Sequence, residues 1–354
     1  MSDRPRVEDR AQAADKGLQF RSVVIGIGLG SLALWLAFRG LDFAQLVAGF
    51  QRIDYALTAA ALLATIAALV LGTLRWQLLF YPNHRRLSFA TLFRANVIGQ
   101  MLNIAIPVRV GEVARLYAVA NAEDVSKARV LGTLAIEKAL DLAAFGLAVL
   151  VVLALVALPV DVRLQQRTLW IAGIGGTLVL WVLARQRARY SAALGWLIAR
   201  LPARWQPRLQ RGATEFLEGL SVFDSSWAWL ATIVLTLAIV AAGASTNYLL
   251  FLAFGWRLPP LAALLLLVLL QVGAVPPSLP GKVGIFNYVT VVGLSMFAVD
   301  RASALGYSIL LYVVAFGPKL VLGAAYLAVG PRRVPMVSAE IPCVSPPVAA
   351  RPSK

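Results

Sequence analysis

The sequence predicts an all-α protein that crosses a membrane several times, and three observations lead to this prediction. Of its 354 residues, 60% are hydrophobic and only 14% are charged, whereas about 25% of residues are charged in a soluble domain. Apolar runs of about 18 residues or more, the length of a spanning helix, recur along the whole chain. These runs are continuous rather than alternating, which argues against a transmembrane barrel.

We expect about eight spanning helices, preceded by a short polar tail. Residues 1–19 are polar and of mixed charge, and they are predicted to form a cytoplasmic tail. The apolar stretch Ser22–Phe38 is longer than a typical signal-peptide core and no small-x-small cleavage site follows it, so we interpret it as an uncleaved first helix. The transmembrane domain is predicted to cover 20–330, with helices over 20–38, 56–74, 131–158, 168–184, 229–254, 259–279, 283–299 and 303–329.

A ninth apolar segment, 89–106, differs because polar side chains interrupt it. It contains an arginine together with Asn96, Gln100 and Asn103, and a charged side chain at the bilayer centre costs about 2.5–3.5 kcal/mol. Such a segment is either buried among other helices or enters the membrane and returns on the same side. Re-entry with the N-terminus inside is favoured, because a full crossing would place the seven basic residues of 185–228 outside, against the positive-inside rule.

Two segments outside the predicted helices have compositions of their own. The stretch 185–228 is predicted to be a basic cytoplasmic loop that mixes Trp, Leu and Arg. It forms either an amphipathic helix on the inner leaflet or a solvated basic loop with some helix. The last 24 residues, 331–354, contain six prolines and are predicted to be disordered.

Two short motifs of the chain resemble each other. "IPVRVGE" at 106–112 and "LPGKVGI" at 279–285 both contain Pro, a basic residue two positions later, and then Val-Gly. Each is part of a polar or proline-broken apolar segment, and interrupted segments at matching places are typical of transporters built from inverted repeats. One heptapeptide match can also arise by chance, so both interpretations stay open.

The composition excludes several classes of function. A net charge of +16 would indicate nucleic-acid binding in a soluble protein, but here basic inner loops and their attraction to anionic lipid account for it. We expect no nucleic-acid partner. Cys343 is the only cysteine and His84 the only histidine, which excludes a disulfide framework and a thiolate or histidine metal cluster. We expect neither a metal nor a cofactor.

The stretch "NIAIPVRVGEVARLY" places charges directly beside an apolar run. Pro107 disrupts the helix that leads into it, and Gly111 permits a turn or a close backbone approach. If a helix then begins, Glu112 and Arg115 lie on one face and can pair. Arg109 stays available for an anion near the start of that helix. The alternative is flanking positive charge with a local ion pair.

The third predicted spanning helix carries Glu137, Lys138 and Asp141 inside an apolar sequence. The two carboxylates are four residues apart and share a face, whereas the lysine points about 100° away from Glu137. Carboxylates on one face repel each other unless a cation lies between them, and Arg109 or Arg115 is the natural partner. Ionisable residues inside a membrane indicate function; the alternative is a structural ion pair.

The second broken segment, 269–289, which contains Pro276, Pro277 and Pro280, offers further contacts. Its prolines forbid a regular helix, Gly281 and Gly284 make the adjoining backbone more permissive, and Lys282 offers a second anion contact. Irregular backbone at membrane depth persists only where protein buries it or water fills a cavity. An ordinary interfacial loop is the alternative. Lys319, midway along the last helix, would reach the membrane surface only with difficulty and is a candidate cavity residue.

These residues together resemble the motifs of one membrane-protein family. The resemblance is carried by Asn96, by Pro107-Val-Arg109-Val-Gly111-Glu112 with Arg115, by Glu137-Lys138 with Asp141, and by Pro280-Gly281-Lys282 with Gly284. The pattern is similar to the transmembrane region of lysylphosphatidylglycerol synthases, a family that includes many stand-alone flippase-like proteins. The similarity covers about 20–330, nearly the whole chain.

The resemblance implies an inner-membrane protein that moves, or helps to move, a lipid between leaflets. In the two-part synthases a separate soluble domain attaches lysine to phosphatidylglycerol. The longest loop here, 185–228, is only about 44 residues, so we do not expect that activity. Lys138 stands where the family suggests arginine, which keeps the charge but loses bidentate geometry. The lipid is not fixed by the family: an anionic or aminoacylated headgroup, a hopanoid and a glycolipid all remain open.

Three functions are compatible with these residues, and a transporter is expected rather than an enzyme. In the leading hypothesis a headgroup meets Arg109, Arg115 and Lys282, with membrane lipids as partners. In the second, an integral membrane transferase uses the carboxylate pair on a lipid-linked substrate. In the third, the chain is an accessory scaffold that partners lipid-biosynthesis enzymes.

Overall fold

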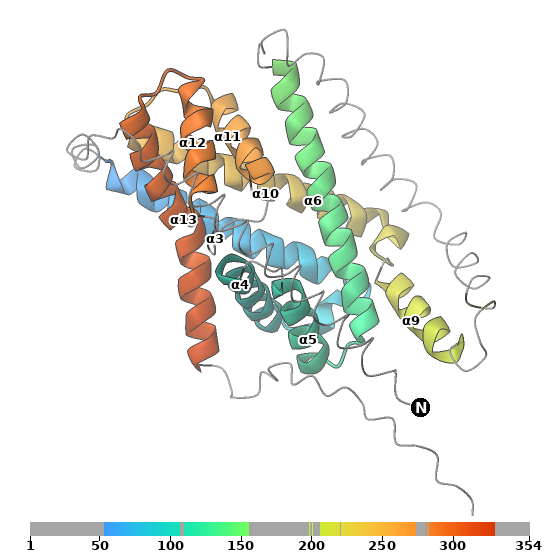
Figure 1. Ribbon diagram of the computed structural model, residues 1–354. Coiled ribbons are helices and arrows are strands. Elements are labelled where there is room, and N and C mark those ends of the chain that lie inside the picture. Colours follow the sequence, from blue (N-terminus) through green and yellow to red (C-terminus); the bar gives the residue numbers. More distant parts are fainter. Residues whose placement is uncertain are drawn as a thin grey trace, which may run out of the picture.

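The computed structural model describes residues 53–106, 110–155, 198, 200, 206–219, 221–273, 281 and 283–329. The predicted helices at 20–38 and 168–184 and the tails 1–19 and 331–354 lie outside this part of the chain. The described residues form helices and turns and no strands (Figure 1). The prediction of an all-α polytopic membrane protein is therefore confirmed.

Four of the described helices are long and apolar enough to cross a membrane. The Asp54 carboxylate starts the first of them by accepting the N–H groups of Ala56 and Leu57 at 2.8 and 3.1 Å, which satisfies donors that a helix leaves free at its start. All four agree with predicted helices to within about four residues, as expected for boundary assignments. They are α3 (Tyr55–Leu78), α6 (Lys127–Leu155), α10 (Ser226–Ala253) and α13 (Arg301–Val329).

Four shorter helices lie between the long ones: α4 (Phe89–Ala105), α5 (Gly111–Ala122), α11 (Pro260–Gly273) and α12 (Ile285–Ser295). At about 1.5 Å per residue, α12 falls short of the roughly 30 Å hydrocarbon core. Here the structure differs from the spanning helix predicted over 283–299, whereas the end of the helix predicted over 259–279 lies outside the described residues. Backbone geometry limits α12 at its start, because Gly284 has φ 90° in the left-handed region that glycine tolerates.

Helix α5 folds back against α4. The two backbones touch, since a Cβ on Gly111 would lie only 2.0 Å from the carbonyl oxygen of Gly99. A chain that enters and returns has this arrangement, so it agrees with the predicted re-entrant segment 89–106. The joint itself, Pro107 to Arg109, lies outside the described residues.

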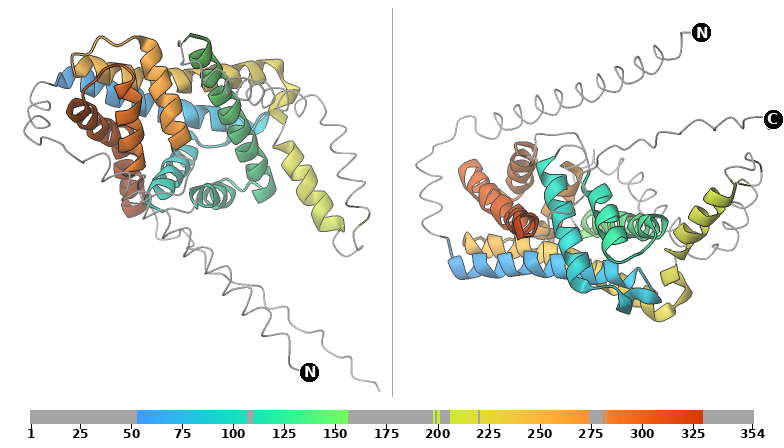
Figure 2. Two further views of the ribbon diagram at one scale, coloured as in Figure 1. Left: turned by 45° about the horizontal axis from the view of Figure 1, so that its top comes forward. Right: turned by 90° about the horizontal axis from the view of Figure 1, so that it is seen from below.

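The order of the elements repeats. Each half has a long helix, two short ones and a second long helix: α3, α4, α5, α6 and then α10, α11, α12, α13. The first helices of the halves, α3 and α10, lie side by side and antiparallel (Figure 2), so that the Asp54 N–H donates to the carbonyl of Ala253 at 3.0 Å. The motifs at 106–112 and 279–285 fall at the joint between the short helices of each half. This arrangement supports an inverted repeat over a chance match.

The basic stretch between the halves contains α9 (Gln206–Glu218), a helix with one apolar and one polar face. It packs closely against α6, because a Cβ on Gly132 would lie 2.5 Å from the Phe216 carbonyl oxygen. Arg129 of α6 also pairs with Glu218 at 3.9 Å. A helix is thus present in the predicted loop 185–228. Two short 3₁₀ helices, η1 (Asn83–Arg86) and η2 (Ser221–Asp224), complete the described elements.

Candidate functional site

A cavity of about 530 Å³ lies where the two halves meet. The first half lines it with six charged side chains, and among the described residues the second half adds one charged side chain and a mostly apolar wall. Thus four cations and three carboxylates line the described part of this cavity: Arg75, Arg115, Lys138 and Lys319 with Glu112, Glu137 and Asp141.

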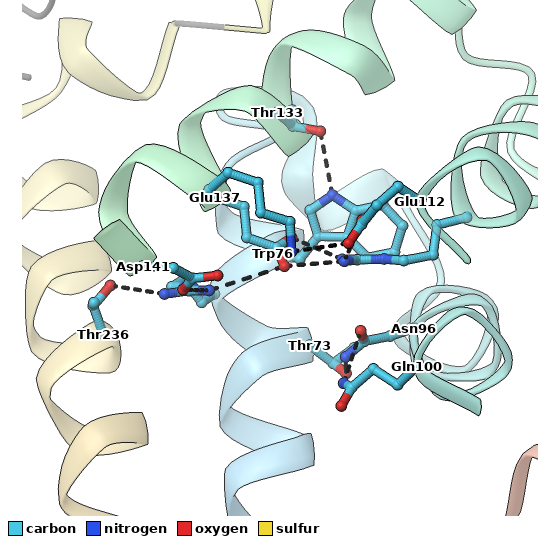
Figure 3. Close-up of polar contacts among 12 residues, drawn as sticks. Thr73, Trp76, Asn96, Gln100, Glu112, Thr133, Glu137, Asp141 and Thr236 are labelled. Carbon is cyan, nitrogen blue, oxygen red and sulfur yellow. Dashed lines mark hydrogen bonds and ion pairs between the residues drawn. The ribbon is translucent and has the colours of Figure 1, made fainter. Parts of the chain in front are cut away.

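The centre of the charged network is a buried pair between Arg115 of α5 and Glu137 of α6. Both terminal nitrogens of the guanidinium donate to the carboxylate, at 3.0 and 2.7 Å, a bidentate geometry that strengthens such pairs. The guanidinium lies 4.1 Å from the ring centroid of Trp76, and the indole N–H donates to Thr133 at 3.2 Å (Figure 3). The Trp76 ring, which is itself held by Thr133, therefore packs against the guanidinium of the pair.

The backbone of α4 and α5 sets the position of this arginine. A Cβ on Gly99 would lie 2.4 Å from Cγ of Arg115, so the arginine stem passes where only glycine leaves room. Asn103 fixes the start of α5, because its side-chain oxygen accepts the Gly111 N–H at 2.8 Å. Its amide also donates to Glu112 at 3.4 Å. Pairing of Glu112 with Arg115 is found as predicted, at 3.3 Å.

Arg75 of α3 is a second buried arginine, and sequence reasoning missed its role. It donates to Asp141 at 2.6 Å and to Thr236 of α10 at 3.3 Å, and it lies 4.0 Å from Glu137. The predicted helix ended at position 74, so Arg75 counted only as a flanking charge. The neighbouring Trp76, an aromatic directly after the apolar run, was the signal that the helix continues.

A looser ion pair lies at the edge of the network. Lys138 contacts Glu112 at 2.9 Å, and their side chains are 50% and 27% exposed. The sequence places Lys138 away from Glu137, and it reaches across to α5 instead. Because this pair is half exposed, it is more easily replaced by other partners than the buried pair behind it.

Amide groups of α4 extend the polar surface of the cavity. The buried Asn96 donates to Thr73 at 3.0 Å and accepts from Gln100 at 3.2 Å (Figure 3). The three amides that α4 contributes to the cavity, Asn96, Gln100 and Asn103, belong to the polar series that set 89–106 apart in the sequence.

Most of the predicted site residues come together, but not all. The described cavity wall includes Asn96, Asn103, Glu112, Arg115, Glu137, Asp141 and Lys319. Four of the others, Pro107, Arg109, Pro280 and Lys282, lie outside the described residues. Gly281 and Gly284 stand at the start of α12 with φ 78° and 90°, where the Gly281 carbonyl accepts from Tyr312 at 2.8 Å.

The expected partner of the acidic pair is confirmed in part. Arg115 holds Glu137, whereas Asp141 is held by Arg75. Each carboxylate thus has its own cation, so the two do not compete for one. Within the described part of the chain, no three His, Cys, Asp or Glu side chains gather closely enough to hold a metal ion.

A match to a protein-family model agrees with the motifs above. No curated protein matches the chain. The family model described as "Lysylphosphatidylglycerol synthase TM region" matches residues 23–323, which include every described residue that lines the cavity. The chain therefore belongs to the lysylphosphatidylglycerol synthase transmembrane-region family of integral membrane proteins, which is related to lipid metabolism or flipping.

Proposed function

We propose that this protein is a flippase-like transporter that moves, or helps to move, a lipid between leaflets with its headgroup in the charged cavity. One observation carries the proposal: the cations and carboxylates of the first half meet in a cavity deep within apolar helices. Glu137 and Asp141 lie about 15 and 21 Å from the start of α6, which is about 43 Å long. Charges at such depth are costly, and they are retained where they line a substrate path.

The chemistry of the network suits an anionic headgroup. Glu112 is the counter-ion of Lys138 and supplements the pair of Arg115 with Glu137. A phosphate can take the place of Glu112 without disturbing the bidentate pair behind it, because its oxygens accept the same hydrogen bonds. Arg109 and Lys282 are further candidates for this contact. The apolar wall from α11 to α13 offers a surface to the acyl chains.

The inverted halves provide a route between leaflets. Transporters with such repeats move by rocking one half against the other around a site near the midplane. The position of the cavity between the halves fits that scheme. We place the protein in the cytoplasmic (inner) membrane with its N-terminus inside, as the distribution of basic residues favours, and with membrane lipids and lipid-biosynthesis enzymes as partners.

The transferase alternative has weaker support. Proton transfer needs a carboxylate within reach of the substrate, but both carboxylate oxygens of Glu137 accept hydrogen bonds from Arg115, and Asp141 is held by Arg75 at 2.6 Å. These contacts make both carboxylates counter-ions of arginines rather than groups placed to exchange a proton with a substrate.

A proteoliposome assay tests the proposal. The protein is reconstituted with phosphatidylglycerol that carries a fluorophore on its acyl chain, and dithionite reports the fraction reaching the outer leaflet. We expect wild type to accelerate this exchange. The variants Arg115→Gln and Glu137→Gln should slow it at least about tenfold, which corresponds to the loss of one charge-assisted hydrogen bond.

The matched control is Arg129→Gln, which removes an ion-paired arginine of α6 that contacts Glu218 outside the cavity. It should leave the exchange unchanged. Equal rates for wild type and both cavity variants, with all proteins monodisperse in size-exclusion chromatography, would rule out the charged cavity as the lipid site. A covalently altered lipid would instead support the transferase.

A further inference from the structure

The cavity walls from α3 and α10 match residue by residue. Lining positions 65, 68, 69, 72 and 75 of α3 correspond to 236, 239, 240, 243 and 246 of α10, always 171 positions later. Thr65 thus corresponds to Thr236, and Arg75 corresponds to Thr246. Since the two helices are antiparallel, this relation is an internal two-fold axis that passes through the cavity.

The contacts obey the same relation. Arg75 donates to Thr236 at 3.3 Å, and the corresponding pair, Thr65 with Thr246, is also 3.3 Å apart. The two contacts lie about 15 Å from each other along α3, ten residues at about 1.5 Å each. The cavity therefore has two equivalent ends: one holds an arginine, and the other holds a threonine in its place.

The carboxylates are also confined to one end. Helix α6 begins at Lys127 and α13 begins 174 positions later, at Arg301. With this spacing of 174, Glu137 corresponds to Leu311 and Asp141 to Ala315, both of which line the cavity. Lys319 stands eight residues beyond Leu311, about 12 Å along α13. The described positions that correspond to Arg75, Glu137 and Asp141 are thus occupied by uncharged residues.

The hydroxyls at this end can accept hydrogen bonds. Thr65 donates to the Ala61 carbonyl at 3.2 Å and Thr246 to the Ala242 carbonyl at 3.0 Å. Each hydroxyl has a single proton, which it gives either to its own helix or to the other threonine, and in both cases the oxygens keep lone pairs that can accept. Thr236 shows the same pattern, since it donates to the Thr232 carbonyl at 2.8 Å and accepts from Arg75.

Because Thr246 stands where Arg75 stands in the other half, this end has room for a hydrogen-bond donor from a ligand. Where Thr236 accepts a guanidinium, Thr65 meets only the shorter Thr246 side chain, and both open toward the same cavity. Gln271 of α11, which corresponds to Gln100 of α4 by the same spacing of 171, adds an amide to the cavity wall.

We propose that Thr65 and Thr246 form a second, uncharged station of the cavity, which accepts hydrogen bonds from hydroxyl groups of the lipid headgroup. This inference rests on the proposed function and specifies the substrate class. A hydroxyl matches two neutral acceptors, whereas an ammonium group would lie there without a counter-ion, at considerable cost. The favoured lipid carries a phosphodiester, which suits the charged end, and an alcohol, such as glycerol or a sugar ring, which suits the other. Because the two ends lie about 15 Å apart, such a headgroup occupies them in turn.

Binding in detergent tests the station independently of transport. Native mass spectrometry of the full chain compares phosphatidylglycerol, which has two free hydroxyls, with phosphatidylmethanol, which has the same charge and none. We expect wild type to prefer phosphatidylglycerol by about tenfold, the worth of one or two hydrogen bonds. The Thr65→Val/Thr246→Val variant should lose this preference and still bind phosphatidylmethanol as wild type does.

Two further variants make the result specific. Thr65→Ser/Thr246→Ser keeps both hydroxyls and should keep the preference. Thr232→Val removes a buried hydroxyl of α10 that bonds to the Ala228 carbonyl at 2.8 Å outside the cavity, and should also keep it. A preference that survives in the double valine variant, or that wild type lacks, overturns the proposal. If the preference is found but no lipid crosses proteoliposomes, the station stands and the transport function fails.

Discussion

Burial should decide what each acidic side chain of the cavity contributes to stability. Glu137 is 9% exposed and its partner Arg115 4%, whereas Asp141 keeps 44% of its side chain exposed although its contact with Arg75 is just as short. Breaking a buried pair leaves a charge without its counter-ion and costs about 3–5 kcal/mol. Without Asp141 the buried Arg75 would still have Glu137 at 4.0 Å as a counter-ion, so the loss there should be close to the value of about 0–1 kcal/mol for a partly exposed pair. We therefore expect Glu137→Gln to lower the free energy of unfolding by about 3 kcal/mol and Asp141→Asn by about 1 kcal/mol.

Chemical unfolding in mild detergent, followed by tryptophan fluorescence, measures both losses. Trp76 is a suitable reporter because the Arg115 guanidinium lies 4.1 Å from its ring centroid. The double variant Arg115→Met/Glu137→Leu removes both buried charges at once and should recover most of the stability lost in Glu137→Gln, while lipid exchange stays abolished. Equal losses in Glu137→Gln and Asp141→Asn, or a double variant less stable than Glu137→Gln, would refute the reasoning.

Three further predictions concern single contacts. Gly99→Ala should destabilise by about 1–3 kcal/mol in the same unfolding assay, because its Cβ would overlap the buried arginine of α5, whereas Gly72→Ala should be tolerated, since its Cβ would meet nothing closer than 4.0 Å. Glu112→Gln frees Lys138 and should tighten phosphatidylglycerol binding about tenfold by native mass spectrometry, the worth of one charged contact. At Asp300, directly before α13, partial burial raises the carboxyl pKa, but N–H donors at the helix start outweigh it and hold the pKa below its usual value. This group therefore stabilises the fold above the unfolded pKa of about 3.9, and the contribution is lost as the pH falls through the lower folded pKa. Asp300→Ala should remove that acid-dependent loss from unfolding measured between about pH 5 and 2.

The long helices could be predicted from the sequence because their cause is local. An apolar run of sufficient length has few alternatives to a spanning helix, and α3, predicted over 56–74, runs from Tyr55 to Leu78. The short helix α12 was predicted too long, because hydrophobicity continues past Ser295, where the helix stops. Its start depends on backbone geometry, at the left-handed Gly284, which an apolar composition does not reveal.

The error at the end of α3 changed the interpretation of the site. With the helix ending at position 74, Arg75 belongs to an inner loop, where a basic residue is expected. Four further residues place it inside the helix and against Asp141 and Thr236. The helix continues because the Trp76 side chain is fully buried. That burial depends on α6, which is distant from α3 in the sequence. A boundary error of one turn was therefore enough to conceal half of the charged network.

The two ends of the cavity differ in how far a sequence can reveal them. Glu137 and Asp141 attract notice because a carboxylate in an apolar run is costly wherever it points. Thr65 and Thr246 carry no such signal, since a threonine that bonds to its own helix costs little in a membrane. Their importance becomes visible only through the antiparallel pairing of α3 with α10, which brings together residues 181 positions apart. A charged residue can thus be recognised as functional from the free-energy cost of placing it in an apolar segment. An uncharged site can be recognised only from the three-dimensional relation between the two halves. The equal 3.3 Å contacts at both ends of the cavity reveal that relation.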